Sequence, residues 1–399
     1  MPSSGRSAAE TAAWLARDAV DSLPEGALEE KLAIGAREGR PLRVKLGIDP
    51  TAPDIHLGHT VVLRKLREFQ DLGHVVVLIV GDYTARVGDP SGRSATRPML
   101  DPSEIDRNAE TFQDQALRVL HASPDRLERR RNGEWLDMPL QDLLVLARTS
   151  TVAQVLERDD FAKRQAASEP ISVLELLYPL LQGYDSVAID ADVELGGTDQ
   201  KFNLLLARHI QRAYGQPEQA ILTVPILVGT DGREKMSKSL GNHIGVTEPP
   251  GEIYGKTLSI PDSALSDYYR LVLGEPPPAS SPREAKRELA RRLVAQFYDE
   301  AAAEEAEREF DRVFIEHQPP EDIEEMVFAS SDGLVHVPAL LEQAFGVSRS
   351  EARRLLEQGG VGLDERVLSA DDLDLPAQEL DGRVLRAGRR RFRRLRWER

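Results

Sequence analysis

Cysteine is absent from the 399-residue chain, which excludes disulfide bonds and thiolate ligands for a metal. The 8 histidines are scattered without the spacing of a zinc site, so no resident metal centre is expected. No segment approaches the roughly 20 apolar residues that span a bilayer, and the first twenty residues lack a basic flank followed by an apolar block. These absences predict a soluble, cytoplasmic protein without redox chemistry at sulfur.

Positive charge is in deficit over the whole chain but not at its C-terminal end. The formal net charge is -16, whereas residues 383–399 contain nine arginines and one glutamate, interleaved with Phe392 and Trp397. Arginine can contact phosphate and aromatic rings can stack on bases, so this tail is a candidate nucleic-acid surface. Taken alone, the run fits a solvated basic tail equally well.

The first 230 residues alternate between strand-like and helix-like segments. Helical periodicity and a turn-like Arg129-Arg130-Arg131-Asn132-Gly133 run mark the charged stretch 101–170 as an insertion. The pattern predicts an α/β fold with a Rossmann-like doubly wound parallel sheet. The expected strands are 42–48, 75–80, 187–189 and 222–228, and the expected helices are 8–37, 58–72, 172–184 and Gly196 to about His209.

Proline-rich breaks separate helical segments in the second half of the chain, notably at Pro249-Pro250 and Pro319-Pro320. Four parts are therefore expected. They are an N-terminal helical arm (1–40), the catalytic domain (41–244, with the insertion at about 101–170), an all-helical domain (245–330) and a small C-terminal domain (331–399).

His56-Leu57-Gly58-His59 stands where the first strand runs through a Pro-rich turn into a helix start. Backbone N–H groups and the helix dipole favour an anion there, and the two imidazoles can donate to phosphoryl oxygens. Gly58 allows a nucleotide to approach closely. A pair of histidines that merely caps the helix is the structural alternative.

Lys235-Met236-Ser237-Lys238-Ser239 lies in a Gly- and Ser-containing loop. Two ammonium groups three residues apart can hold a leaving polyphosphate, and the loop can close over it. A surface loop is the structural alternative, and the presence of the histidine motif in the same chain weighs against it.

The two motifs resemble the hallmark motifs of class I aminoacyl-tRNA synthetases, and the chain from about Leu42 to its C-terminus resembles the bacterial tyrosyl-tRNA synthetase family. Further family motifs follow in order: Asp89-Pro90-Ser91-Gly92, Tyr178-Pro179-Leu180-Leu181-Gln182-Gly183-Tyr184-Asp185 and Gly196-Gly197-Thr198-Asp199-Gln200. The resemblance implies an enzyme that uses ATP and Mg²⁺ to convert L-tyrosine to tyrosyl-adenylate and then charges tRNA(Tyr). It also implies a homodimer formed through the insertion and an anticodon-contacting helical domain.

Tyr178, Gln182 and Asp185 stand at i, i+4 and i+7, so a helix presents them on one face of a Leu-rich segment. Hydrogen bonds within the core are the structural alternative. The resemblance implies that Tyr178, Gln182 and Asp89 hold the amino group of the substrate and that Asp185 accepts its phenolic hydroxyl. Many family members place a second phenol partner, a tyrosine, where this chain has Lys45, so that partner is left open.

The resemblance also assigns the remaining ligand-binding residues. Asp199 could accept from ribose hydroxyls, although an N-cap role fits its position as well. The assigned sets are Thr51 with His56, His59, Lys235 and Lys238 for catalysis, Gln200 for tyrosine, and Gly47, Asp49, Gly58, Gly197, Asp199, Arg93 and Arg97 for ATP.

Residues 331–399 resemble a small α+β S-four-like RNA-binding domain, which strengthens the nucleic-acid interpretation of the tail. The arginines expected to contact RNA are Arg349, Arg353, Arg354, Arg390 and Arg391. Three other functions stay open: a tryptophan-specific relative, a non-catalytic RNA-binding protein on the same fold, and another nucleotidyltransferase. A carboxylate such as Asp185 in an apolar helix suits a phenol better than an indole.

Overall fold

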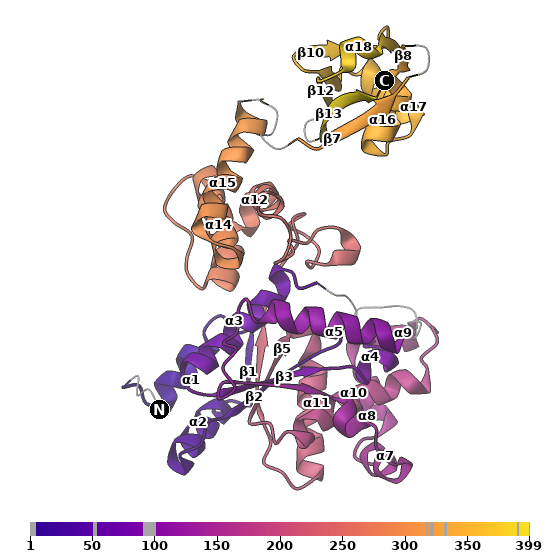
Figure 1. Cartoon of the computed structure of the whole chain (residues 1–399). Helices are drawn as coiled ribbons and strands as arrows, with labels where there is room; N and C mark the ends of the chain where they lie inside the picture. Colours follow the sequence, from indigo (N-terminus) through magenta and orange to yellow (C-terminus); the bar gives the residue numbers. More distant parts are fainter. Residues whose placement is uncertain are drawn as a thin grey trace. The chain divides into compact units, whose positions relative to one another are not determined.

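A computed structural model of the chain describes residues 5–50, 54–90, 101–316, 318, 323–330, 333–388 and 391–398 (Figure 1). The chain divides into two compact units, the first comprising Met1–Pro249 and Lys256–Leu289 and the second Pro250–Gly255 and Ala290–Arg399. Within the described ranges, no helix combines the length and apolar character that a membrane span requires.

The first unit is built on a six-stranded sheet with the strand order β1-β6-β5-β2-β3-β4. The five strands from β6 to β4 are parallel, and β1 pairs antiparallel with β6 at the edge. This arrangement confirms the predicted doubly wound α/β fold. The strands are β1 (Asp21–Leu23), β2 (Arg43–Ile48), β3 (Val75–Val80), β4 (Leu127–Arg131), β5 (Val193–Gly197) and β6 (Ala220–Val224).

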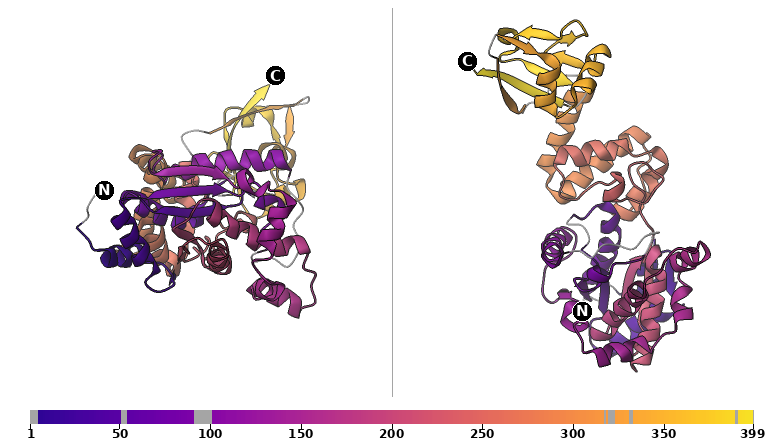
Figure 2. Two further views of the ribbon diagram at one scale, coloured as in Figure 1. Left: turned by 90° about the horizontal axis from the view of Figure 1, so that it is seen from below. Right: turned by 90° about the vertical axis from the view of Figure 1, so that its right-hand side faces the viewer.

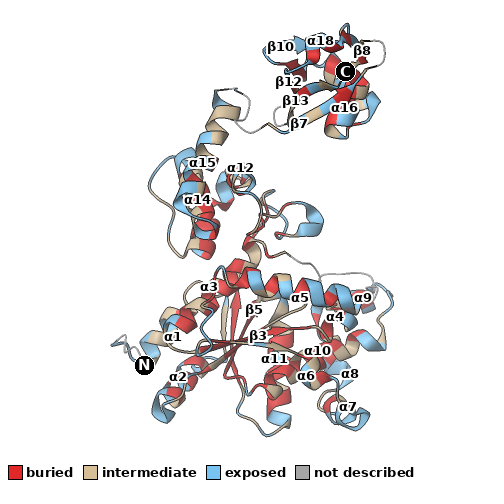
Figure 3. Cartoon of the chain, viewed as in Figure 1, coloured by how far each residue is buried: buried red, intermediate tan, exposed pale blue. Residues whose placement is uncertain are grey.

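Helices cover both faces of this sheet, with α3 and α5 on one side and α10 and α11 on the other (Figures 1 and 2). All six residues of β3 are apolar and buried, as expected for a central strand covered on both faces (Figure 3). The long helices are α1 (Ala8–Ala16), α2 (Ala27–Glu38), α3 (Leu57–Asp71), α5 (Pro102–Ala116), α10 (Val173–Ala188) and α11 (Lys201–Ala213).

The chain passes from β2 outward to β3 and β4, and then returns to β5 on the other side of β2. The connections therefore diverge between β2 and β5, and the carboxyl ends of these two strands border a crevice of the kind that binds ligands in open α/β sheets. Short helices surround this region. They are α4 (Thr84–Val87), α6 (Gly133–Leu136), α7 (Leu140–Ala147), α8 (Val152–Leu156), α9 (Asp159–Ala166), η1 (Thr198–Gln200) and η2 (Lys238–Leu240).

Four local predictions were wrong. Gly196 and Gly197, expected to open a helix, are the last residues of β5, and the helical segment begins after them with η1 and α11. The arginine run 129–131 is not a turn but most of β4, and it can carry charge because β4 is an edge strand of the sheet. The expected strand at 187–189 is the end of α10, since a short apolar run does not distinguish a strand from a buried helix end. The helical stretch 8–37 contains β1, which places part of the expected arm in the sheet.

Helices continue from residue 250 to residue 315. They are α12 (Pro250–Ser259), η3 (Asp262–Ala264), α13 (Leu265–Asp267), η4 (Tyr268–Leu273), α14 (Pro282–Phe297), α15 (Glu300–Phe310) and η5 (Asp311–Ile315).

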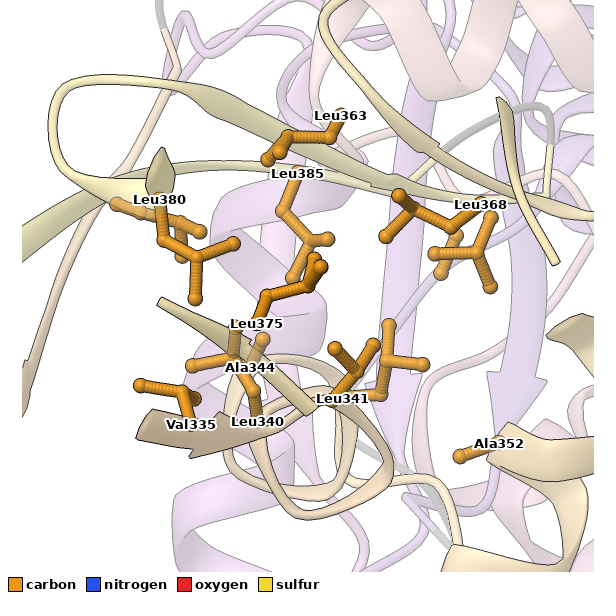
Figure 4. Packing of buried hydrophobic residues seen from close by; sticks show 14 of the residues in the cluster. Val335, Leu340, Leu341, Ala344, Ala352, Leu363, Leu368, Leu375, Leu380 and Leu385 are labelled. Carbon is orange, nitrogen blue, oxygen red and sulfur yellow. The ribbon is translucent and has the colours of Figure 1, made fainter. Parts of the chain in front are cut away.

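The C-terminal part is a small α+β module. Its five-stranded sheet has the order β10-β9-β12-β13-β7, and β7 lies before the expected boundary at residue 331. Leu340 and Leu341 of α16 pack with Leu363, Leu380 and Leu385 in one buried cluster (Figure 4). The elements are β7 (Glu325–Ala329), β8 (Leu334–His336), α16 (Val337–Phe345), α17 (Arg349–Glu357), β9 (Val361–Leu363), β10 (Arg366–Leu368), β11 (Asp374–Pro376), α18 (Ala377–Leu380), β12 (Val384–Ala387) and β13 (Arg391–Glu398).

Candidate active site

The histidine motif forms the N-terminus of α3, and both rings bond to the backbone there. The Nδ1 atom of His56 accepts the N–H of Gly58, and Nδ1 of His59 accepts the N–H of His56, each at 3.2 Å. The ring centroids are 4.0 Å apart. Because each Nδ1 is an acceptor, each neutral ring carries its proton on Nε2 and can still donate from it.

Burial keeps both imidazoles neutral. It lowers the pKa of His56 to about 2 and the pKa of His59 to about 4, and the positive charge of Lys235 acts in the same direction on both. Helix capping and phosphate binding are therefore compatible, since capping occupies Nδ1 alone. A Cβ on Gly58 would lie 3.0 Å from the His56 ring, which explains the glycine between the histidines.

The lysine loop is anchored by its neighbours. Met236 is buried, and its N–H donates to the carbonyl of Leu227 at 2.9 Å. The carboxamide of Asn242 accepts the N–H of Ser237 at 2.8 Å and donates to Asp231 at 2.6 Å. These contacts hold the backbone between the two lysines while their side chains stay about half exposed.

The two lysines join the loop to both sides of the crevice. Lys238 forms an ion pair with Asp54, in the turn before α3, and Lys235 lies 3.6 Å from Asp199, which follows β5. The structure thus brings the lysine motif to the histidine motif and to the expected ribose-binding position. Both carboxylates hold ammonium groups that a polyphosphate could attract away.

The polar face of α10 points at residues that follow β2 and β3. The hydroxyl of Tyr178 donates to Asp49 at 2.9 Å, and Thr84 donates to the other oxygen of Asp49 at 2.7 Å. Burial raises the pKa of Asp49 to about 7 and raises that of Tyr178. Asp49 was expected to contact ATP. In the structure its carboxylate accepts the hydrogen bond that orients the phenol of Tyr178.

Asp185, about two helical turns beyond Tyr178 in α10, is 2% exposed. The indole N–H of Trp135 donates to its Oδ1 at 2.8 Å, and Asn132 donates to its Oδ2 at 3.4 Å. Burial raises the pKa of Asp185 to about 6, against the opposing charge of Lys45. Two neutral donors occupy the carboxylate, which has room for further donors.

Lys45 is not bonded to Asp185. Its ammonium group lies 2.7 Å from a carboxylate oxygen of Glu194 and donates to Ser186 Oγ at 2.8 Å and to the carbonyl of Gln182 at 3.0 Å. These contacts use all three of its N–H donors. By contrast, the Oε1 atom of Gln182 is buried, and no donor among the described residues reaches it.

A second carboxylate, Asp89, is held from two directions. Gln200 donates to one of its oxygens and Arg158 to the other, both at 2.9 Å. Arg158 is buried between α8 and α9 and also lies 2.9 Å from Asp160. The side chain of Asn203 donates to Gln200 at 2.9 Å, so Asp89 and Gln200 belong to one polar network.

Two of the predicted glycines, Gly47 and Gly197, differ in the space beside their backbone. A Cβ on Gly47 would meet nothing within 4 Å, so there is open space beside the end of β2. A Cβ on Gly197 would lie 2.6 Å from the carboxylate of Asp199. Three predicted ligand-binding residues, Thr51, Arg93 and Arg97, lie outside the described residues.

The predicted RNA-binding arginines lie on two elements of the C-terminal module. Arg349, Arg353 and Arg354 are exposed on α17 and Arg391 is exposed at the start of β13. Arg349 is paired with Glu342 at 2.8 Å, whereas no described acidic side chain pairs with Arg353 or Arg354. Arg390 lies outside the described residues.

Sequence reasoning missed five residues that border the predicted ones: Thr84, Asn132, Trp135, Arg158 and Asn203. Asn132 and Trp135 were missed because the segment 129–133, which contains Asn132 and ends two residues before Trp135, was interpreted as a turn. One signal was available, since the chain has only 3 tryptophans, and a tryptophan inside a charged insertion needs a packing or hydrogen-bonding reason.

Comparisons with known proteins identify the family to which the chain is similar. The family model described as "tRNA synthetases class I (W and Y)" matches residues 37–315. The tyrosine–tRNA ligase of Moorella thermoacetica is 49% identical over 96% of this chain and 94% of its own length. The tyrosine–tRNA ligase of Thermotoga maritima is 48% identical over 96% of both chains.

Solved structures share the fold at lower identity. The tyrosyl-tRNA synthetase of Archaeoglobus fulgidus, solved with L-tyrosine, has a TM-score of 0.61 at 23% identity and covers 74% of this chain and 99% of its own. The C-terminally truncated mitochondrial tyrosyl-tRNA synthetase of Aspergillus nidulans has a TM-score of 0.64 at 21% identity, covering 77% and 94%.

Proposed function

The chain belongs to the class I (W and Y) tRNA synthetases and, within them, to the tyrosine–tRNA ligases, and we propose that the residues around the carboxyl ends of β2 and β5 form its active site. The reaction activates L-tyrosine with ATP to tyrosyl-adenylate and pyrophosphate, and then transfers the tyrosyl group to tRNA(Tyr) with release of AMP.

The observation that carries the assignment of the amino-acid pocket is the buried Asp185. Among the described residues, only neutral donors contact its carboxylate, and a phenolic hydroxyl can complete its hydrogen bonding. Phenylalanine would bury the same carboxylate without that donor, and leaving a buried charged acceptor unsatisfied is costly. Asp185 therefore selects tyrosine.

The amino group of the substrate has three acceptors available. These are the carboxylate of Asp89, the Oε1 atom of Gln182, which lacks a donor, and the hydroxyl oxygen of Tyr178, whose proton is directed at Asp49. Gln200 donates to Asp89 and keeps it oriented toward the pocket. The chain thus holds both ends of the amino acid and leaves its carboxylate free to attack the α-phosphorus.

Phosphate stabilisation is assigned to neutral histidines and charged lysines. The Nε2–H groups of His56 and His59 point from the positive end of the α3 dipole, and they donate without needing protonation at neutral pH. Lys235 and Lys238 exchange Asp199 and Asp54 for the leaving pyrophosphate as charge develops on it. We place Thr51, Arg93 and Arg97 with them as proposed phosphate contacts on the family resemblance.

Ribose recognition is assigned to Asp199, next to Gly197 at the end of β5, with Gly47 leaving room at the end of β2. The side chains proposed to contact the phosphates of ATP offer imidazole and ammonium N–H donors. Within the described ranges, no group of three or more acidic or histidine side chains could hold a metal. We therefore propose that Mg²⁺ arrives on ATP, where it neutralises phosphate charge.

A homodimer is proposed from an exposed apolar patch at the insertion. Leu140 and Leu144 of α7 are 70% and 61% exposed, Val152 of α8 is 61% exposed, and Val173 at the start of α10 is 76% exposed. Both α7 and α8 pack against α10. Large apolar side chains exposed on such neighbouring helices mark an interaction surface, and a second copy of the chain is the occupant we propose. The segment that carries them also contains Arg158, which reaches Asp89.

The tRNA is proposed to contact the C-terminal module through Arg349, Arg353, Arg354, Arg390 and Arg391. Arg353 and Arg354 are available for phosphate because no described acidic side chain neutralises them. Because the product supplies translation, we propose a cytoplasmic location.

The test is amino-acid-dependent exchange of pyrophosphate into ATP, with tyrosine, tryptophan and phenylalanine. The protein should exchange with tyrosine, and Asp185→Asn should lose selection against phenylalanine, whereas Asp137→Asn, at the exposed end of α6, should retain it. Exchange with tryptophan alone would overturn the specificity. Absence of exchange with all three would favour a non-catalytic RNA-binding protein.

A further inference from the structure

Lys45 and Glu194 form a buried ion pair that has no part in the proposed binding of tyrosine or ATP. Lys45 lies in β2 and Glu194 in the neighbouring strand β5, and their side chains are 0% and 1% exposed. Desolvation offsets most of the attraction in such a pair, so apolar residues would often serve stability as well. An electrostatic role would explain why Lys45 and Glu194 stand here instead of two apolar residues.

The contacts of the pair place it against α10, the helix that carries Asp185. Lys45 donates to the carbonyl of Gln182 and to the hydroxyl of Ser186, the residues that flank the turn carrying Asp185. Glu194 also accepts from Ser186, at 3.3 Å, and from Gln219. The ammonium group is therefore fixed close to Asp185 but has no N–H left to give to it or to a substrate hydroxyl.

We propose that Lys45 is a specificity-determining positioning residue, whose charge, held in place by Glu194, acts through space to keep Asp185 an ionised acceptor for the tyrosine hydroxyl. The inference rests on the proposed role of Asp185. The second contribution to recognition of the phenol is then the electric field of the Lys45 ammonium group and not a hydrogen bond.

The charged and titratable groups around Asp185 set the sign of the effect. Lys45 faces it from β2, Glu194 from β5, and Asp49, which repels its charge, from the end of β2. The neutral donors Trp135 and Asn132 complete its surroundings. Burial raises the pKa of Asp185 to about 6, the charge of Lys45 is the largest opposing influence, and Glu194 adds a smaller upward one.

The pH dependence follows directly. A carboxyl with a pKa of about 6 is ionised above pH 6, so selection of tyrosine over phenylalanine should decline as the pH falls through about 6. Lys45 lowers the pKa of Asp185 by more than Glu194 raises it, so removing both charges should raise this pKa. The midpoint of selection should then move upward, by about one pH unit.

The experiment measures the ratio of kcat/KM for tyrosine to that for phenylalanine, by pyrophosphate exchange, from pH 5 to 9. The variant is Lys45→Met with Glu194→Gln, and Lys45→Gln with Glu194→Gln is a second variant that keeps hydrogen bonds if the first does not fold. With the midpoint moved from about 6 to about 7, the ionised fraction at pH 6.5 falls from about 0.8 to about 0.2. The ratio at pH 6.5 should therefore drop about threefold to fourfold, and above pH 8.5 it should return to the value of the unmodified protein.

A matched control removes a different buried pair. Lys65 of α3 is 1% exposed and lies 2.8 Å from Glu68, on the side of the sheet opposite α10, so Lys65→Met with Glu68→Gln likewise removes one buried ammonium group and one buried carboxylate. Glu68 also pairs with Arg17 and Arg64, so this control disturbs buried charge at least as strongly without approaching Asp185. Its midpoint should stay near 6. An equal shift in both double variants, or no shift in either Lys45 variant, overturns the inference.

Asp185→Asn separates this inference from the function on which it rests. If Asp185→Asn loses selection while the Lys45 variants keep an unshifted midpoint, Lys45 has no such role and Asp185 retains its own. If Asp185→Asn selects tyrosine as the unmodified protein does, the assignment of Asp185 itself is wrong and the inference fails with it.

Discussion

Arg158 offers a sharp test of how the insertion supports the amino-acid pocket. Its side chain is 4% exposed, donates hydrogen bonds to Asp89 at 2.9 Å and to Asn203 at 3.1 Å, and forms an ion pair with Asp160 at 2.9 Å. Arg158→Met keeps most of the apolar volume but leaves both carboxylates without their cation. Removing one partner of a fully buried ion pair costs about 3–5 kcal/mol. Asp89 and Asp160 retain 20% and 14% exposure, so we expect a loss of about 2–4 kcal/mol in the free energy of unfolding.

The catalytic effect should be specific for tyrosine. Asp89 is proposed to accept the amino group of the substrate, and an oriented hydrogen bond to a charged group contributes about 1.5–3 kcal/mol. Loss of that orientation should lower kcat/KM for tyrosine by about 10- to 100-fold in pyrophosphate exchange, chiefly through KM. The KM for ATP should change little, because the proposed phosphate contacts lie on α3 and the lysine loop.

Arg164→Met is the matched control. Arg164 is also buried in the insertion and lies 2.7 Å from Glu175, at the start of α10 and away from Asp89. It should lose comparable stability in urea unfolding, followed through Trp14 and Trp135 of the same unit, and keep its KM for tyrosine. The reasoning is refuted if Arg158→Met leaves that KM unchanged or if both variants raise it equally.

Three further predictions concern other parts of the chain. Val173→Asp, which places a charge in the exposed apolar patch, should convert a dimer to a monomer in size-exclusion chromatography with light scattering; a dimer that survives would contradict the proposed interface. Burial lowers the pKa of His74 to about 4, so its contribution to stability is present above pH 6.5 and is lost as the pH falls below it, by on the order of 1 kcal/mol per pH unit; His74→Asn should flatten the acid dependence of urea unfolding, and an unchanged slope would count against it. Arg353→Gln should raise the KM for tRNA and weaken its salt dependence without affecting pyrophosphate exchange, whereas Arg396→Gln, whose charge is already paired with Glu325 at 3.1 Å, should have a smaller effect; equal effects would remove the distinction between free and paired arginines.

Local pattern predicted three strands of the six-stranded sheet, β2, β3 and, with displaced bounds, β6. The apolar run at 75–80 became the central strand β3, and the strand at 42–48 became β2 with a boundary difference of one residue. Prediction failed where two structures share one local pattern. The end of α10 resembled a strand, and β4 was obscured by arginines that an edge strand tolerates.

The candidate site was predictable to the same degree. Spacing along one helix placed Tyr178, Gln182 and Asp185 on one face, and α10 carries all three as expected. Their partners were not predictable, because contacts such as that between Lys45 and the carbonyl of Gln182 join residues 137 positions apart. Helical periodicity carries no information about such a distant partner.

By itself the sequence determined the doubly wound α/β class, the two motifs proposed to bind phosphate and the polar face of α10, because each can be recognised from periodicity or from residues that are close together in the chain. The tertiary structure alone decided that Asp49 accepts from Tyr178, that Arg158 reaches Asp89, and that Lys45 pairs with Glu194. Those choices depend on strand order, register and the direction of buried side chains, which are set only when distant segments pack and exclude water.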